Sequence, residues 1–479
     1  MGIFMKPERI ISARATGALH VRTVLTACLA AAGLLSSAPW AQAQGQIAIK
    51  GGRIISVAHP PIDGGVILIR DGRIQAVGKD LTIPSDYKVI DATGKVIMPG
   101  FIEAHSSRGM DQANERNNNV PFLSVMDAID PGQEYFEDCR RNGVTTVAVA
   151  PGDDTMIGGQ AAIIKTAGAL VDQMVVKRQA GVKISLKPGV GRSRMSQLAS
   201  LRKELDNARD AILDESDKPK VAGAGAGADD NDDNGGGQNV DDPAQQQQPD
   251  GVPTAPDAAA DAGIRRETLI RLLKGEMPAY IYCELAMDVP QAIKLTKEYN
   301  LKTTLILGHN CYKAAKQIAA SKLPVVVDST LVFWETDPRT GEDHKIVIPK
   351  IYRDAGIPLT FQVTGIAAGS LFRAPDLPPT LGSNFLWYQA ATAVKYGLPV
   401  AEALDAITLR PAKLLGIEKL AGSIEPGKDA DLVILTGDPL RVSTWVDKTL
   451  VRGQVVYERE KDRKLQQLLP TPSPSVTSR

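Results

Sequence analysis

Residue types that can hold metals or act as nucleophiles are scarce in this chain. Its 479 residues include five histidines and four cysteines. Five histidines allow at most one histidine-rich metal site, and four cysteines are too few for a disulfide scaffold. No serine or cysteine lies in a nucleophile elbow with a matching histidine. The positions of the few histidines therefore decide which metal chemistry the chain can perform.

Apolar runs rich in β-branched residues alternate with helical stretches through the middle of the sequence. The expected strands are 144–150, 182–186, 279–283, 303–307, 324–327 and 357–361. The expected helices are 195–215, 264–273, 289–299, 313–321, 385–396 and 400–415. This alternation predicts βαβ units, and the length favours a closed (β/α)8 TIM-like barrel over residues 99–415. Active-site side chains of such a barrel lie where its strands end.

Short alternating strands occur at both ends of the chain. Residues 64–77 have the pattern of a hairpin in which Asp71 and Gly72 accept positive φ. Residues 432–435 and 449–457 form the C-terminal counterpart. We expect residues 46–98 and 416–458 to build one small composite β-sandwich domain.

Three segments have compositions that do not indicate a packed core. Residues 1–43 have a basic start, an apolar run and Ala41-Gln42-Ala43, which predict a cleavable signal peptide and a periplasmic or secreted protein with no membrane span after cleavage. Residues 216–263 carry ten aspartates and no aromatic side chain, which predicts a disordered acidic insertion; an acidic tether for a basic partner is the alternative. The Pro- and Ser-rich end predicts a disordered tail over 462–479.

The charge balance argues against one class of partner. The chain has 55 basic and 55 acidic side chains. A nucleic-acid-binding protein normally shows a basic face, so we expect no nucleic acid to bind.

Several motifs resemble the amidohydrolase superfamily, and its imidazolonepropionase-like branch in particular. Residues 96–105 are similar to the entry into the first barrel strand of that family, and residues 409–416 and 422–433 to its C-terminal signature. Residues 143–147 and 158–162 resemble the imidazolonepropionase-like branch. The resemblance implies a barrel with a metal-activated water that hydrolyses non-peptide C–N bonds, such as those of cyclic amides.

The metal ligands that this resemblance implies are only partly present. His105 and His309 match ligand positions on the first and sixth strands, whereas Ser107 and Tyr282 stand where the family has histidine. Gln362 stands near the expected catalytic aspartate. The resemblance thus implies a degenerate metal site. Two further lysines, at or after the end of the fourth strand, are either carbamylated bridges or simply solvated: Lys183 and Lys187.

A remodelled site is one way to restore the chemistry. Glu284 faces the same side of its strand as Tyr282, and Asp328 ends the strand 324–327. With His105 and His309 they could bind one Zn, Fe or Mn ion, with Asp328 and Gln362 acting in catalysis. Alternatively, Glu284 and Asp328 pair with arginines or backbone amides and no metal binds. His59 and His344 lie in segments typical of the surface.

Two functions remain open from the sequence. The first is a hydrolase acting on a small-molecule amide, with most metal ligands replaced. The second is a catalytically inactive relative that binds a ligand or partners an active amidohydrolase paralogue. A homo-oligomer is compatible with either function.

Overall fold

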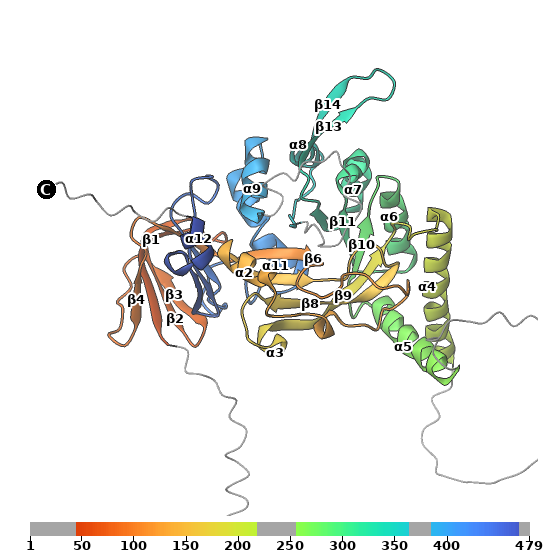
Figure 1. Cartoon of the computed structure of the whole chain (residues 1–479), viewed down its shortest axis with the longest axis horizontal. Coiled ribbons are helices and arrows are strands. Elements are labelled where there is room, and N and C mark those ends of the chain that lie inside the picture. Colours follow the sequence, from red (N-terminus) through yellow and green to blue (C-terminus); the bar gives the residue numbers. More distant parts are fainter. Residues whose placement is uncertain (1–44, 218–254, 364–384, 469–479) are drawn as a thin grey trace, which may run out of the picture. The chain divides into compact units, whose positions relative to one another are not determined.

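The computed structural model describes residues 45–217, 255–363 and 385–468. The predicted signal peptide (1–43), most of the acidic insertion and the last part of the tail lie outside these residues. Two mixed sheets and a separate hairpin account for the strands (Figure 1). None of the helices in the described ranges has the length and apolarity needed to cross a membrane.

One sheet contains strands from both ends of the chain. Its strands follow the order β17-β16-β15-β5-β1-β2-β3, and β4 pairs with β1. Their bounds are β1 (Ile47–Ile54), β2 (Ile62–Arg70), β3 (Arg73–Gly78), β4 (Lys88–Asp91), β5 (Val96–Pro99), β15 (Leu432–Leu435), β16 (Val446–Val451) and β17 (Gln454–Glu458). The predicted joint origin from both termini is confirmed by the antiparallel pairing of β15 with β5. Hydrogen bonding joins these strands in one sheet, and the two-layer packing of a sandwich stays a prediction.

The predicted β2–β3 hairpin is confirmed. Asp71 and Gly72 connect the strands with φ values of 52° and 76°. Two successive positive φ values are typical of the type I′ turn, whose twist matches that of the flanking strands. Apolar side chains from both ends of the chain share the core of this sheet, including Ile49, Ile67, Ile97, Leu432 and Leu450.

The second sheet forms most of a barrel. Its seven strands follow the order β12-β11-β10-β9-β8-β7-β6. Their bounds are β6 (Phe101–Ser106), β7 (Val144–Val149), β8 (Ile157–Lys165), β9 (Val175–Ser185), β10 (Ala279–Cys283), β11 (Thr303–Leu307) and β12 (Val325–Val327). Two further chain segments, one containing Thr360 and one containing Ile407, lie between the edge strands β12 and β6 and hydrogen-bond to them. The Val327 amide donates to the Thr360 carbonyl at 2.9 Å, and the Ile102 amide of β6 donates to the Ile407 carbonyl at 2.9 Å. The barrel is therefore nearly closed.

Two details differ from an all-parallel eight-stranded barrel. Strand β8 runs antiparallel to both β7 and β9. Only residues 150–156 connect β7 to β8, which is too short for the crossover that parallel strands need. The expected strand 357–361 is also wrong as a full strand, since Phe361 makes only an isolated parallel bridge to Val327.

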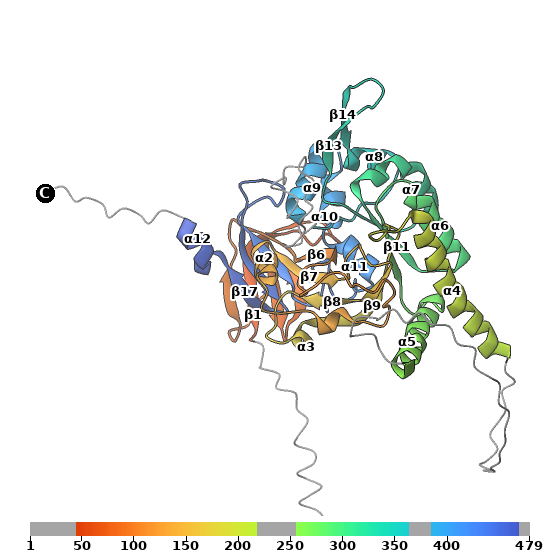
Figure 2. The same cartoon turned by 45° about the vertical axis from the view of Figure 1, so that its right-hand side comes forward.

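Helices cover the barrel and connect its strands (Figure 2). Their bounds are α2 (Glu134–Arg141), α3 (Val171–Met174), α4 (Arg194–Asp217), α5 (Ala255–Leu273), α6 (Asp288–Glu298), α7 (Ala315–Ser321), α8 (Ile348–Asp354), α9 (Leu386–Lys395), α10 (Val400–Asp405), α11 (Leu409–Leu415) and α12 (Arg463–Leu468). Three short 3-10 helices are η1 (Val125–Asp127), η2 (His309–Ala314) and η3 (Arg459–Lys461). The single helix expected over 400–415 is two helices, because the backbone between them contacts β6.

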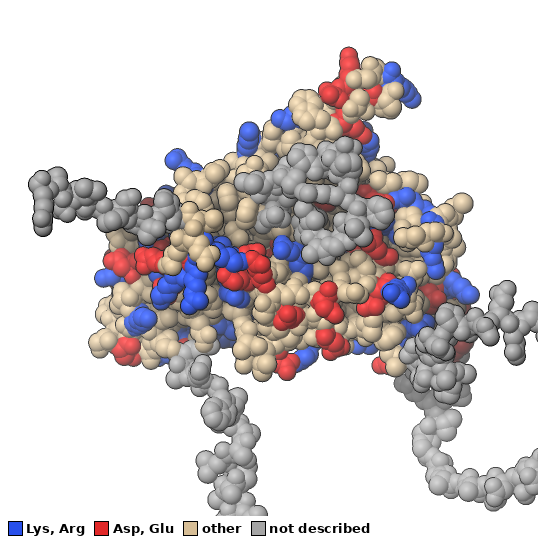
Figure 3. All heavy atoms as spheres, viewed as in Figure 1, with Lys and Arg blue, Asp and Glu red and all other residues tan. Residues whose placement is uncertain are grey.

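A hairpin of β13 (Val332–Thr336) and β14 (Asp343–Val347) projects from the barrel in both views (Figures 1 and 2). His344 lies on β14 and is exposed, as expected. On the face shown in Figure 3, acidic and basic side chains are interspersed.

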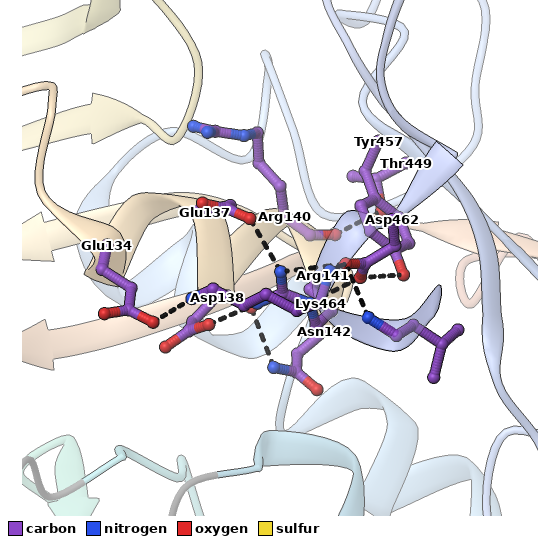
Figure 4. A network of polar contacts seen from close by, with 11 residues as sticks. Glu134, Glu137, Asp138, Arg140, Arg141, Asn142, Thr449, Tyr457, Asp462 and Lys464 are labelled. Atoms are coloured by element: carbon purple, nitrogen blue, oxygen red, sulfur yellow. Dashed lines mark hydrogen bonds and ion pairs between the residues drawn. The ribbon is translucent and has the colours of Figure 1, made fainter. Parts of the chain in front are cut away.

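Two segments predicted to lack structure are partly ordered. Helix α5 begins at Ala255, inside the predicted insertion 216–263, and continues to Leu273, with Leu269 and Leu272 buried near its end. The tail prediction is wrong for 462–468. The Asp462 side chain is 2% exposed and accepts a hydrogen bond from Arg141 Nε of α2 at 2.7 Å (Figure 4). This hydrogen bond lowers the pKa of Asp462 to about 2 and attaches the start of the tail to the barrel.

Candidate functional site

The candidate site begins with His105, the penultimate residue of β6. Its side chain lies at the carboxyl end of that strand, where barrel enzymes place their reactive groups. His105 is 6% exposed, and both ring nitrogens have partners. Nδ1 lies 2.9 Å from Gln362 Oε1, and Nε2 lies 2.7 Å from Lys183 Nζ. The structure therefore brings together two predicted site residues, His105 and Gln362. Lys183 contacts the other side of the His105 ring.

Lys183 connects the histidine to a carboxylate. It lies on β9, and its side chain is fully buried. Its ammonium also lies 2.6 Å from Oδ1 of Asp153, in the loop between β7 and β8. The Asp153 side chain is 37% exposed, so this end of the cluster reaches solvent. On the neighbouring strand β10, the Tyr282 ring centre lies 5.4 Å from Lys183 Nζ, within cation–π distance.

These contacts define the protonation of the cluster. An ammonium group only donates, so His105 Nε2 accepts from Lys183, and His105 Nδ1–H donates to Gln362. Burial lowers the pKa of His105 to about 3, and the Lys183 charge acts in the same direction. Burial raises the pKa of Asp153, but the charge and hydrogen bond of Lys183, together with the charges of His105 and Lys187, outweigh it, and the pKa is lowered. Burial lowers the pKa of Lys183, and the charge and hydrogen bond of Asp153 act against this shift. With Lys183 protonated, the cluster contains a carboxylate, an ammonium and a neutral imidazole.

Buried polar contacts hold Gln362 in place. The Gln389 side-chain amide donates to the Gln362 carbonyl at 2.8 Å, and the next amide, of Val363, donates to Glu103 Oε1 at 2.5 Å. Glu103 lies on β6 two residues before His105 and is 2% exposed. These contacts orient Gln362 toward the histidine.

Comparisons with known proteins agree with this architecture. Residues 391–457 match the model of the family described as "Amidohydrolase family". Imidazolonepropionase of Symbiobacterium thermophilum is 25% identical over 429 residues, covering 84% of this chain and 92% of that protein. The crystal structure of an amidohydrolase from Thermotoga maritima superposes with a TM-score of 0.68 at 24% identity, covering 86% of this chain and all of the other. The chain belongs to the amidohydrolase superfamily.

Another relative in this superfamily is much longer. Amidohydrolase tasK of Hapsidospora irregularis is 23% identical over 431 residues, which cover 80% of this chain. The chain spans 39% of the length of tasK, and the matched part of the adenine deaminase of Listeria monocytogenes is 18% of that enzyme.

The other predicted site residues of this amidohydrolase-superfamily member have partners of their own. Glu284 Oε2 pairs with Arg194 Nη2 at 2.7 Å. Asp328 Oδ1 accepts from the Thr330 amide at 2.7 Å, as an ordinary turn contact. The His309 ring lies at the start of η2 and packs edge-on against Phe333, with ring centres 5.3 Å apart.

The residues that the structure describes therefore do not fit the metal centre implied by the superfamily. Within the described ranges, no three or more His, Cys, Asp or Glu side chains are grouped so that they could hold a metal ion. His105, His309, Glu284 and Asp328 are not brought together as a four-ligand set. The nearest cation to His105 is the ammonium of Lys183.

Sequence reasoning missed Asp153 and gave Lys183 a different role. Asp153 follows the predicted strand 144–150 within the polar sequence Pro151-Gly152-Asp153-Asp154, and a carboxylate directly after a strand was a usable signal. Lys183 was expected as a carbamylated bridge or a solvated lysine; it is instead buried against Asp153 and His105.

A large cavity lies elsewhere. It has a volume of about 620 Å³ and contains none of the cluster residues. Its walls come from α2, α9 and the C-terminal strands, including Trp387, Tyr388 and Trp445. Its lining is mainly apolar, and two carboxylates in it, Asp138 and Asp462, are paired with Arg141.

Proposed function

We propose that this chain hydrolyses C–N bonds of small non-peptide amides, with cyclic amides as the preferred class. One observation carries the proposal: a charged Asp153–Lys183–His105 cluster lies at the ends of the barrel strands and opens to solvent at Asp153. Membership of the amidohydrolase superfamily supports the reaction class. We propose the periplasm or the outside of the cell as the location of this activity, on the basis of the signal peptide that the sequence predicts.

Asp153 has the properties of a general base. Its carboxylate is ionised at neutral pH, because the Lys183 charge lowers its pKa. It would take a proton from a water molecule as the water oxygen bonds to the substrate carbonyl carbon. The same proton would then pass to the departing nitrogen as the C–N bond breaks, leaving a carboxylic acid and an amine.

Tyr282 is placed to stabilise the charge that develops on the substrate oxygen. Burial and the neighbouring Asp153 charge raise the pKa of its phenol, so the hydroxyl stays protonated. A protonated phenol in a buried setting can donate a hydrogen bond to an oxyanion. Lys183 acts as a positioning residue that keeps Asp153 ionised.

The test is turnover of a panel of hydantoin-like rings, dihydropyrimidines and N-acyl amino acids, followed by NMR. We expect Asp153→Asn to lower kcat by about 10²-fold or more. Tyr282→Phe should lower kcat by about 10²-fold, with KM changed less. Asp154→Asn is the matched control, because Asp154 pairs with Lys187 and its side chain is 58% exposed. No hydrolysis of any panel member, or equal rates for Asp153→Asn and the wild type, would refute the proposal.

A second candidate function is a non-catalytic subunit that binds an amide ligand beside an active paralogue. The observation that favours it is that His105, Glu284 and Asp328 all bind groups of their own chain. It predicts no turnover by the purified chain, together with a rise in Tm on adding panel ligands. Turnover that depends on Asp153 in the isolated chain would rule it out.

A further inference from the structure

The ammonium group of Lys183 lies between two atoms that a divalent ion would use. Its Nζ is 2.7 Å from His105 Nε2 and 2.6 Å from Asp153 Oδ1. An imidazole nitrogen and a carboxylate oxygen are common zinc ligands, at distances of about 2.0–2.2 Å. In this chain both atoms face a cation that belongs to the protein.

We propose that Lys183 is the resident cation of this barrel, so that the site is built around a protein ammonium group instead of a metal ion. The inference deepens the proposed function and rests on it for its catalytic consequence. Hydrolysis would then be independent of added or bound metal. Whether a metal ion or the Lys183 ammonium group occupies the site can be measured separately from turnover.

Three contacts keep the ammonium in place. Asp153 supplies a full negative charge, His105 a lone pair, and the Tyr282 ring a cation–π contact. The backbone is also constrained, because β9 is hydrogen-bonded between β8 and β10, with Lys183 opposite Tyr280. Holding Lys183 there therefore does not depend on a flexible loop.

The same contacts work against a metal ion. The only lone pair of neutral His105 is directed at Lys183, and its other nitrogen donates to Gln362. A divalent ion at Nε2 would also lie next to a buried positive charge. Repulsion between like charges is strong where water is excluded. Glu284 is not available as a replacement ligand, since Arg194 and, more distantly, Lys187 pair with it.

The first experiment measures metal in the full chain, expressed in medium with added Zn²⁺ and then dialysed. We expect substoichiometric Zn, Fe and Mn by elemental analysis, and no change in Tm on adding a chelator. Titration with Zn²⁺ or Mn²⁺, with and without bicarbonate, should show no saturable site that depends on His105. Stoichiometric metal that is lost in His105→Gln would overturn the inference. So would bicarbonate-dependent metal binding with a mass increase equal to CO₂, because it would make Lys183 a carbamate.

The second experiment removes the positive charge of Lys183. Lys183→Met keeps most of the side-chain volume but leaves Asp153 without its partner, so Tm should fall by on the order of 5 °C. Adding Asp153→Asn to that variant should recover part of the loss. Lys187→Met is the matched control, because Lys187 lies on the same segment with its side chain 34% exposed, and its Tm should change little. Equal Tm for Lys183→Met and the wild type would contradict a resident cation.

The two proposals fail in different ways. A metal-free chain without turnover would overturn the proposed hydrolase and leave the resident cation standing. Turnover that requires a stoichiometric metal would support hydrolysis and overturn the resident cation.

Discussion

Two fully buried lysines lie at opposite ends of the barrel. Lys165 is the last residue of β8, and Lys183 lies near the end of β9. Because β8 runs antiparallel to its neighbours, its last residue lies beside Thr146 near the start of β7. Lys183 instead lies at the carboxyl end of the parallel strands. The two side chains thus have similar burial and different surroundings.

The partners of the two lysines explain what each one does. Lys165 pairs with Asp431 and, at 3.1 Å, with Asp429, whose side chains are 3% and 11% exposed. Asp431 directly precedes β15 and Asp429 lies two residues before Asp431, so this closed cluster joins the barrel to the terminal sheet. Lys183 has one carboxylate, 37% exposed, and one neutral imidazole. A buried lysine enclosed by carboxylates is structural, whereas one whose carboxylate reaches solvent can support chemistry.

The largest effect on stability should come from Lys165. Lys165→Met leaves two buried carboxylates without a cation, and we expect the free energy of unfolding to fall by about 3–5 kcal/mol. Urea unfolding measures this loss. The control is Lys461→Met, whose side chain is 74% exposed and pairs with Glu458, and it should change stability by less than about 1 kcal/mol. Similar losses for both variants would remove the structural role assigned to Lys165.

A smaller effect should distinguish the Lys183 cluster by its pH dependence. The folded pKa of His105 is about 3, below its ordinary 6.5, so between these values only the unfolded chain binds the proton. Stability should therefore fall as pH decreases through this window, by about 2 kcal/mol at pH 5 relative to pH 7. His105→Gln removes this contribution, and urea unfolding at both pH values measures it.

The control for that experiment is His344→Gln on the exposed strand β14, which should keep the pH dependence of the wild type. The Asp153 carboxyl, whose pKa is lowered, loses its contribution only at lower pH, below its ordinary 3.8. A His105→Gln variant with the same loss as the wild type between pH 7 and pH 5 would show that His105 is not held neutral.

The smallest effect should come from Glu284, the carboxylate that was expected to bind metal. Glu284→Gln weakens a partly exposed ion pair with Arg194 and should cost about 1 kcal/mol or less. Glu298→Gln, with the same 34% exposure and a looser pair to Arg202, is the matched control. Bound metal that disappears in Glu284→Gln would restore the remodelled metal site and break the comparison of the two lysines.

Local patterns predicted many elements of the fold. The runs 279–283, 303–307 and 432–435 match β10, β11 and β15, because short apolar runs of buried strands differ from the more polar segments around them. The reversed direction of β8 and the single bridge at Phe361 were not predicted. Both depend on how the barrel closes, which involves residues far apart in sequence.

In the candidate site, too, local sequence predicted some features and long-range contacts set the others. The sequence alone determined that His105 and Lys183 lie at or near strand ends of one barrel, since strand periodicity and motif order place them there. Tertiary structure alone decided their chemistry. Asp153, in a loop, pairs with Lys183, and Glu284 pairs with Arg194. The Lys183 ammonium group donates to the lone pair of His105 Nε2. The physical reason is that secondary structure follows from neighbouring residues, whereas the partner of a buried charge is set by which distant segment packs against it.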